Sequence, residues 1–231
     1  MLYYLAVRAV LEVFTVPPFD ENTYLVGDAD AGLAAVVDPG GRAADIVREA
    51  ERRGTRIHLI LATHGHIDHV SGVDELRALT GAPFWAHADG APLLAALPRQ
   101  AAMFGLPAPD PPRVDGHLSA GQALHVGALT LEVRHTPGHA PGHVTLVGPE
   151  IEWDGTRQRF ALVGDVIFYG SIGRTDLPGG DYDTLLGSIT REILSLPEDT
   201  VLHSGHGPAT TVGRERRFNP FVREWLREHG R

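Results

Sequence analysis

The sequence predicts an α/β protein built as a four-layer αββα sandwich, with two β-sheets inside and helices on both outer faces. Short apolar runs bounded by turn residues alternate with segments of helical spacing, and this pattern runs twice along the 231 residues. No linker separates the two passes. A chain of this length can bury roughly 70 to 75% of its unfolded surface. Residues 1–231 are therefore expected to form one domain of packed layers.

The first pass begins with three short apolar runs that are predicted to be antiparallel strands: residues 11–16, 22–26 and 33–40. A helix is expected next over residues 42–53, because apolar residues recur there at helical spacing and Gly54 supplies a stop. The run H-L-I-L-A-T at 58–63 predicts a buried strand.

The middle of the chain is predicted to contain helix 70–79, strand 82–87 and a second short helix at 88–97. The Pro-rich stretch 98–113 follows and is expected to be a lid or binding loop, since long loops inside compact domains are usually functional. Within it, Met103 and Phe104 are candidates to roof a pocket.

The second pass repeats the pattern. Two or three strands are expected within 124–147 and another at 161–168, followed by helix 182–194, a strand at 200–203 and a last helix.

Composition limits the function. The formal charge of −9 argues against nucleic-acid binding, which usually needs a basic face. With no cysteine, any metal must be held by nitrogen and oxygen ligands. The N-terminus lacks a basic segment leading into an apolar core, and no apolar run approaches membrane-spanning length. A cytoplasmic protein without membrane contact is expected.

The stretch T-H-G-H-I-D-H at 63–69 carries the chemistry. Extended residues two apart point the same way, so His64 and His66 can face one cation. Asp68 and His69 are adjacent, and a turn into the following helix would place them beside a second cation. Gly65 lets the backbone approach the metals closely.

Two such sites need further ligands, because zinc-like ions usually take four or five. His139, Asp165 and His206 each follow a predicted strand and are flanked by Gly or Pro, so they can converge on one rim of the sheets. Spacing alone leaves His143 as an alternative to His139.

The order T-H-G-H-I-D-H, T-P-G-H-A-P-G-H, G-D-V-I-F and G-H-G-P resembles the metallo-β-lactamase fold superfamily, in particular its glyoxalase II (hydroxyacylglutathione hydrolase) branch. V-V-D-P-G, G-S-I-G-R-T-D-L-P-G-G-D and T-T-V-G-R-E-R-R-F-N-P-F are similar to the small, single-domain bacterial members. The resemblance implies one metal on His64, His66 and His139, a second on Asp68, His69 and His206, and Asp165 bridging. It also implies that Asp38 orients ligand histidines from behind.

The activity implied is a binuclear thioester hydrolase that converts S-2-hydroxyacylglutathione, or a related small-molecule thioester, to a 2-hydroxy acid and a thiol. Two divalent ions, zinc first and iron or manganese as alternatives, would activate a bridging hydroxide. Asp68 and Asp165 are the predicted catalytic carboxylates. A thiolate leaving group, with a pKa near 8.5, needs no general acid. The sequence does not fix the oligomeric state, monomer or homodimer.

The chain departs from the glyoxalase II pattern in its substrate contacts. Arg174 matches a basic residue used on glutathione, but Asp176 and Pro208 stand where aromatic residues are expected. The C-terminal helical part with basic glutathione contacts is shortened, leaving Arg214, Arg216 and Arg217 as possible substitutes. Alternatives are a persulfide dioxygenase with a single iron, a hydrolase of other esters or lactones, and a non-catalytic metal-binding module.

Overall fold

Two six-stranded sheets face each other in the computed structural model, which describes residues 8–107, 109–153 and 155–229. In the first sheet the strands lie in chain order: β1 (Ala9–Val16), β2 (Glu21–Asp28), β3 (Leu33–Val37), β4 (Arg56–Leu61), β5 (Phe84–His87) and β6 (Gly116–Leu118). In the second the order is β14 (Thr210–Thr211), β13 (Val201–Ser204), β10 (Thr156–Gly164), β9 (Val144–Trp153), β8 (Leu129–His135) and β7 (Ala123–Val126). The first three strands are antiparallel, as predicted.

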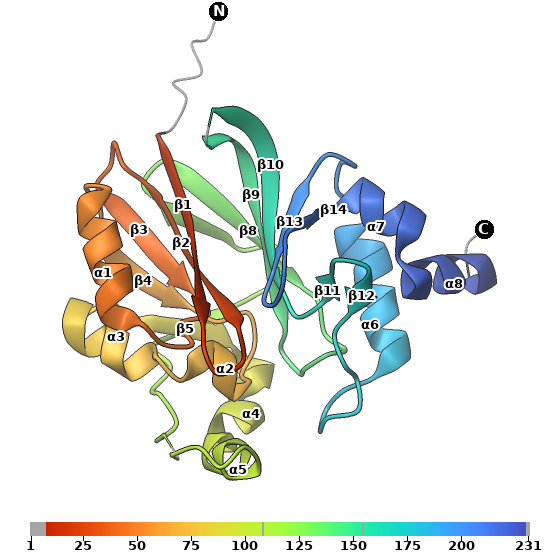
Figure 1. The fold of residues 1–231 in the computed structure, drawn as a ribbon, viewed down its shortest axis with the longest axis horizontal. Helices are drawn as coiled ribbons and strands as arrows, with labels where there is room; N and C mark the ends of the chain where they lie inside the picture. The colour runs from red at the N-terminus through yellow and green to blue at the C-terminus, as the bar shows by residue number, and fades with distance from the viewer. Residues whose placement is uncertain (1–7, 108, 154, 230–231) are drawn as a thin grey trace, which may run out of the picture.

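Helices cover the outer face of each sheet, so the predicted four-layer sandwich is confirmed (Figure 1). On one side lie α1 (Ala43–Arg52) and α3 (Val73–Thr80), and on the other α6 (Tyr182–Ser188), α7 (Val212–Phe218) and α8 (Pro220–His229). Three apolar cores separate the four layers. Neighbouring residues of one strand serve two of them: Val36 packs under α1, whereas Val37 packs between the sheets.

The segment after β5 differs from its prediction. The single helix expected at 88–97 is a 3₁₀ turn (Ala88–Gly90) and α4 (Ala91–Ala95), and the expected loop 98–113 begins as α5 (Leu97–Met103). Proline explains the difference. Pro98 cannot continue α4 because its ring clashes with the carbonyl four residues back, yet it is well tolerated in the first turn of α5.

Two other predicted helices are also interrupted. The helix expected at 70–79 is α2 (Ile67–Val70) followed by α3, and the one expected at 182–194 continues beyond α6 as a π-helix (Ile189–Ile193). Within the part of the chain that the structure describes, no helix is long and apolar enough to cross a bilayer. The N-terminal segment on which part of the localisation prediction rests, residues 1–7, lies outside it.

His203 lies buried among Tyr24, Trp153 and Phe160, and its Nε2 has no hydrogen-bond partner among the described residues. Burial lowers the pKa of His203 from 6.5 to about 4. Between these two values the unfolded chain binds the extra proton. The contribution of His203 to stability is therefore complete above pH 6.5 and is lost as the pH falls toward 4, by about 3 kcal/mol in total.

The His203→Leu variant cannot take up this proton on unfolding, so its free energy of unfolding is expected to depend less on pH between 7 and 4 than that of the wild type. The free energy of unfolding, measured by denaturant titration at pH 7 and pH 4.5, should fall less in the variant than in the wild type. Equal losses in the two proteins would show that His203 is not the group responsible.

Candidate metal centre

The candidate ligands lie at one edge of the sandwich because the strands that precede them run in the same direction. Strands β8 and β10 are both antiparallel to β9, and β10 is parallel to β13, so their carboxyl ends share an edge. The loops after these strands carry His139, Asp165 and His206. The loop after β4 and helix α2 carry His64, His66, Asp68 and His69. The structure brings these seven side chains close together.

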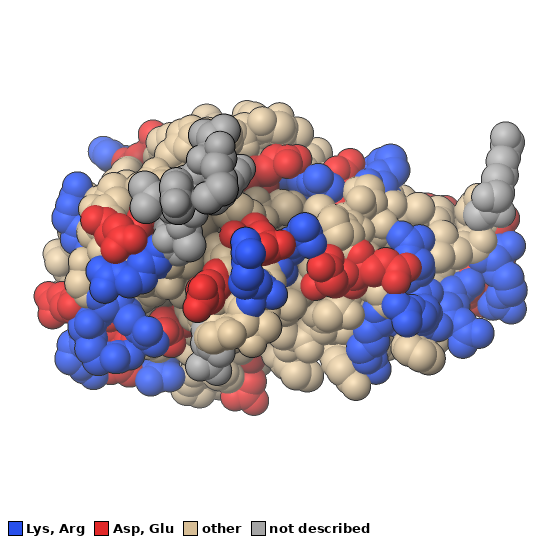
Figure 2. Space-filling model, turned by 90° about the horizontal axis from the view of Figure 1, so that it is seen from above, with Lys and Arg blue, Asp and Glu red and all other residues tan. Residues whose placement is uncertain are grey.

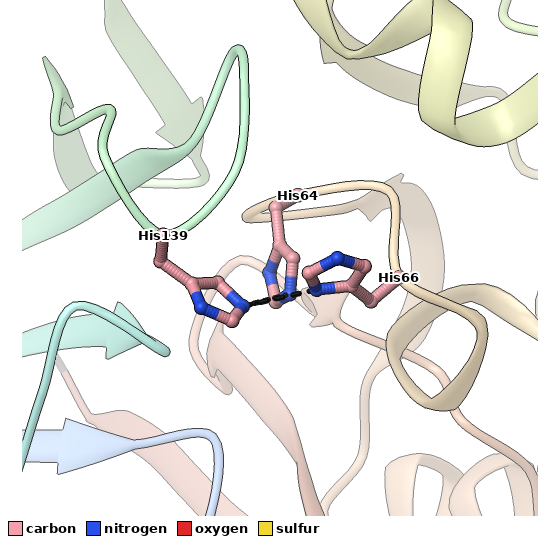
Figure 3. A group of neighbouring side chains, drawn as sticks. All are labelled: His64, His66 and His139. Atoms are coloured by element: carbon pink, nitrogen blue, oxygen red, sulfur yellow. Dashed lines mark hydrogen bonds between the residues drawn. The ribbon is translucent and has the colours of Figure 1, made fainter. Parts of the chain in front are cut away.

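His64, His66 and His139 form the first group, and their rings point toward one another (Figure 3). His139 Nε2 lies 2.9 Å from His66 Nδ1 and 3.3 Å from His64 Nε2. All three side chains are buried. Nitrogen atoms this close, facing a common point, form the grouping expected for one cation.

Asp68, His69 and His206 form the second group. His206 Nε2 lies 3.2 Å from Asp68 Oδ2, and His69 Nε2 lies 3.7 Å from the same oxygen. Asp165 stands between the groups: its Oδ1 is 3.4 Å from His69 Nε2, and its Oδ2 is 3.7 Å from His139 Nε2 and 3.6 Å from His206 Nε2. One carboxylate thus reaches both groups, the position that the bridging role requires.

The ring nitrogen on the far side of most of these histidines is already occupied. Nδ1 of His69 contacts Asp38 Oδ2 at 3.0 Å, that of His139 the Arg174 carbonyl at 2.8 Å, and that of His206 the Phe19 carbonyl at 3.2 Å. Nδ1 of His64 contacts Thr63 Oγ1 at 3.0 Å. Such partners place the proton on Nδ1 and leave Nε2 with a lone pair for a metal. His66 instead presents Nδ1.

Asp38 occupies the predicted place behind the ligands. Its Oδ1 accepts the Thr63 backbone N–H at 2.6 Å, and its Oδ2 accepts the Thr63 hydroxyl at 2.7 Å together with the His69 ring. The residue adopts a left-handed conformation, with φ of 55°. Asp38 therefore fixes both the start of the histidine loop and one ring within it.

His143, the alternative to His139, uses both ring nitrogens for other contacts. Its Nε2 accepts the Asp165 backbone N–H at 3.2 Å, and its Nδ1 contacts Thr136 Oγ1 at 3.0 Å. The ring also stacks on His64, with centroids 4.9 Å apart. These contacts make His143 a positioning residue for Asp165.

The donor set fits divalent cations. His69 Nε2 and Asp165 Oδ1 are buried without hydrogen-bond partners among the described residues, which is costly unless another group binds them. Gly205 closes over this point, since a Cβ there would lie 2.2 Å from Asp165 Oδ1. Any larger residue would displace the carboxylate.

The pKa shifts of the histidines also indicate a site that suits cations. Burial lowers the pKa of His64 well below its usual value and that of His66 to about 3, so both rings remain neutral donors. Burial acts the same way on His69, but the carboxylates of Asp165, Asp68 and Asp38 outweigh it and raise the pKa of this ring. The second group therefore attracts positive charge even within the protein interior.

A cavity of about 770 Å³ opens over the centre and is lined in part by His66, Asp68, His139, Asp165 and His206. Arg174, the predicted substrate contact, also lines it, but its guanidinium makes two hydrogen bonds to Asp176, at 2.7 and 2.9 Å. The residue that replaces the expected aromatic thus forms an exposed ion pair with this arginine.

Basic side chains gather at the end of the molecule that carries α7 and α8 (Figure 2). The three arginines of α7 considered as substitute glutathione contacts have partners there: Arg214 binds Glu215 and lies over the Tyr169 ring, Arg216 donates to the Leu194 carbonyl, and Arg217 binds Glu198. None of them lines the cavity. In the structure these three side chains therefore contact groups of the protein itself.

Gln100 was not identified from the sequence, although it holds the histidine loop in place. Its Oε1 accepts the Ile67 N–H at 2.9 Å, and its Nε2 donates to the Gly65 and Leu93 carbonyls at 3.3 and 2.9 Å. The sequence gives no sign of this role, because its composition predicts a loop at residue 100. Its position in α5 explains the contact.

Comparison with known proteins agrees with this geometry. Residues 16–206 match the family described as the metallo-beta-lactamase superfamily. Hydroxyacylglutathione hydrolase GloC of Haemophilus influenzae is 38% identical over 214 residues, covering 92% of this chain and 97% of that protein.

Two solved structures are similar over the same extent. BLEG-1, described as a B3 metallo-beta-lactamase, superposes with a TM-score of 0.80 at 36% identity, covering 92% of this chain and 99% of that one. TTHA1623 in a di-iron-bound form superposes with a TM-score of 0.77 at 38% identity, covering 91% of this chain and 99% of that one.

Proposed function

Because this chain belongs to the metallo-beta-lactamase superfamily of metal-dependent hydrolases, we propose that it hydrolyses thioesters with a pair of divalent cations, in the manner of glyoxalase II. The observation that carries the proposal is the position of Asp165 between two groups of three ligands. The similarity to a hydroxyacylglutathione hydrolase over nearly the whole chain supports the thioester.

His64, His66 and His139 would hold one ion, Asp68, His69 and His206 the other, and Asp165 both. Divalent ions bound in this way supply Lewis acidity and lower the pKa of water from 15.7 to about 7. Zinc is the first candidate, and iron is supported by the di-iron form of a relative.

The chain itself positions the reacting groups. Four ligands are held by such contacts: Asp38 holds His69, His143 holds the backbone of Asp165, and the carbonyls of Arg174 and Phe19 hold His139 and His206. These four are therefore oriented before the substrate arrives. Asp68 lines the cavity, with its Oδ2 3.2 Å from His206 Nε2, so its carboxylate would face a thioester bound there. A thiol product leaves as the thiolate, since its pKa lies near 8.5. The reaction therefore needs neither a cysteine nucleophile nor a lysine as general acid, and neither residue lines the cavity.

The proposal is tested by measuring metal content and thiol release together. The protein is loaded separately with zinc, manganese and ferrous iron, its bound metal is quantified, and thiol release is followed with S-lactoylglutathione and other thioesters. We expect two ions per chain and metal-dependent thiol release. His66→Ala should lose both properties, whereas His125→Ala, which removes an exposed histidine bonded only to Thr130, should retain them.

The persulfide dioxygenase alternative gives a different result in the same experiment. One iron per chain, with oxygen consumption and sulfite formation from a persulfide and no thiol release from thioesters, would replace the proposed function.

A further inference from the structure

The cavity over the metal centre is lined mainly by apolar side chains. Apart from the ligands and a few polar groups, its wall is formed by residues from the β1–β2 turn, α4, α5 and the β11–β12 hairpin (Ile167–Phe168 and Ser171–Ile172): Phe19, Leu93, Met103, Phe104, Phe168 and Ile172. Such a wall binds hydrocarbon by removing it from water and offers little to a charged group.

The cavity offers few cations to a substrate. Arg99 and Arg174 are the basic residues that line it, and both are exposed, so they stand at its rim. Arg174 is paired with Asp176, which leaves Arg99 as the lining cation with no carboxylate partner in the described ranges. A glutathione carrier has two carboxylates, whereas this rim provides one arginine that is not already paired with an acidic side chain of the described residues.

The apolar wall extends outward through α5. Met103 and Phe104 are 66% and 53% exposed although they line the cavity, and the Phe104 ring meets Phe19 edge to face with centroids 4.9 Å apart. Large apolar side chains that are exposed side by side often mark a surface that binds an apolar ligand. The interior and one side of the mouth therefore form one continuous hydrocarbon surface.

We propose that the preferred substrate carries an apolar acyl chain, which lies against the wall formed by Phe19, Leu93, Met103 and Phe104. The polar thiol carrier extends past the rim toward solvent. This inference rests on the proposed thioester hydrolysis and specifies its substrate class. It places small hydroxyacyl groups such as lactoyl among the poorer substrates.

A series of straight-chain acyl thioesters tests the proposal. Acetyl, butanoyl, hexanoyl and octanoyl thioesters of N-acetylcysteamine share one small, uncharged thiol, so only the acyl chain changes. With the metal-loaded protein, kcat/KM should rise with each methylene by up to about fourfold, the value for full burial of that group. S-lactoylglutathione should be turned over less efficiently than the octanoyl thioester.

The result can contradict the inference and the proposed function separately. Thiol release that is flat or falls with chain length, with S-lactoylglutathione preferred, would overturn the inference and leave thioester hydrolysis standing. Absence of thiol release from every thioester with a fully metal-loaded protein would overturn both.

A pair of matched variants ties the effect to the wall. Phe104→Ser should flatten the dependence of kcat/KM on chain length. Phe218→Ser removes a phenylalanine that is 64% exposed on α7 and does not line the cavity, so its dependence should match the wild type. An unchanged dependence in Phe104→Ser would show that the chain lies elsewhere.

Discussion

Asp165→Asn is expected to abolish turnover and to leave the protein unable to retain both ions. Asparagine has the size of aspartate, but it replaces one of two anionic oxygens with an N–H donor that faces His69, His139 or His206. The remaining oxygen cannot serve both ligand groups. Losing about 4 kcal/mol of the several that metal ions contribute to the transition state corresponds to roughly a thousandfold loss of rate. Metal content and kcat/KM are the measurements.

A surface variant of the same kind is the control. Asp199→Asn changes a carboxylate whose side chain is 67% exposed and paired with Arg159 on the surface, so its metal content and turnover should equal those of the wild type. The metal-free Asp165→Asn variant should be less stable to heat than the metal-free wild type: although burial opposes the charge, the imidazoles of His69 and His139 outweigh it and hold the pKa of Asp165 below its usual range, and an amide loses this attraction. Two tightly bound ions and normal turnover in Asp165→Asn would exclude the bridging role.

The positions of the ligands could be predicted from the sequence because strand direction determines where loops meet. His139, Asp165 and His206 each follow a strand that is recognisable by its apolar run, and the strands run in one direction. The H-x-H-x-D-H spacing supplied the rest, since His64 and His66 share one side and Asp68 with His69 the other. Local spacing and topology thus predicted where the candidates meet, whereas the family resemblance supplied their division into two groups and the choice of His139 over His143.

The surroundings of the ligands could not be predicted in the same way, because they depend on contacts between distant segments. Nothing in the sequence near Gln100 indicates that its amide will reach the Ile67 N–H, nor near His143 that its ring will accept the Asp165 amide. Arg174 and Asp176 are only two positions apart in the sequence, yet the family resemblance that predicts a substrate contact at Arg174 does not reveal that the two side chains are paired. Motifs report ligands well, but they report the charge available to a substrate poorly.

The same limit applies to helix boundaries. Pro98 and its neighbours were assigned to a loop from composition, whereas the structure uses this proline to begin α5. This difference bears on function, since α5 carries Gln100 and Met103 and ends at Phe104, and these residues connect the histidine loop to the cavity wall.

Asp38→Asn is expected to lower the affinity for metal by about 10- to 100-fold while the fold is retained. Asparagine tolerates the left-handed backbone at this position, so the chain can keep its course. The carboxylate, however, accepts three donors: the Thr63 N–H, the Thr63 hydroxyl and the His69 ring N–H. An amide has one oxygen for them and turns its own N–H₂ toward at least one donor. The affinity is measured by competition with a chelator.

Thr63→Val separates the two functions of this carboxylate. It removes the hydroxyl that donates to Asp38 and also contacts His64 Nδ1, but it leaves the bond between Asp38 and His69, so His69 Nε2 should remain oriented toward Asp68 and Asp165. If Asp38 acts through His69, Asp38→Asn should weaken metal binding far more than Thr63→Val. Both variants leave a buried polar group without a hydrogen-bond partner, so both should lower the free energy of unfolding by about 1 to 3 kcal/mol. Equal metal affinities in the two variants would show that the contact from Asp38 to His69 contributes no more to metal binding than the Thr63 hydroxyl does. The orientation of His69 would then depend on its packing against His64, whose ring centroid lies 4.1 Å away.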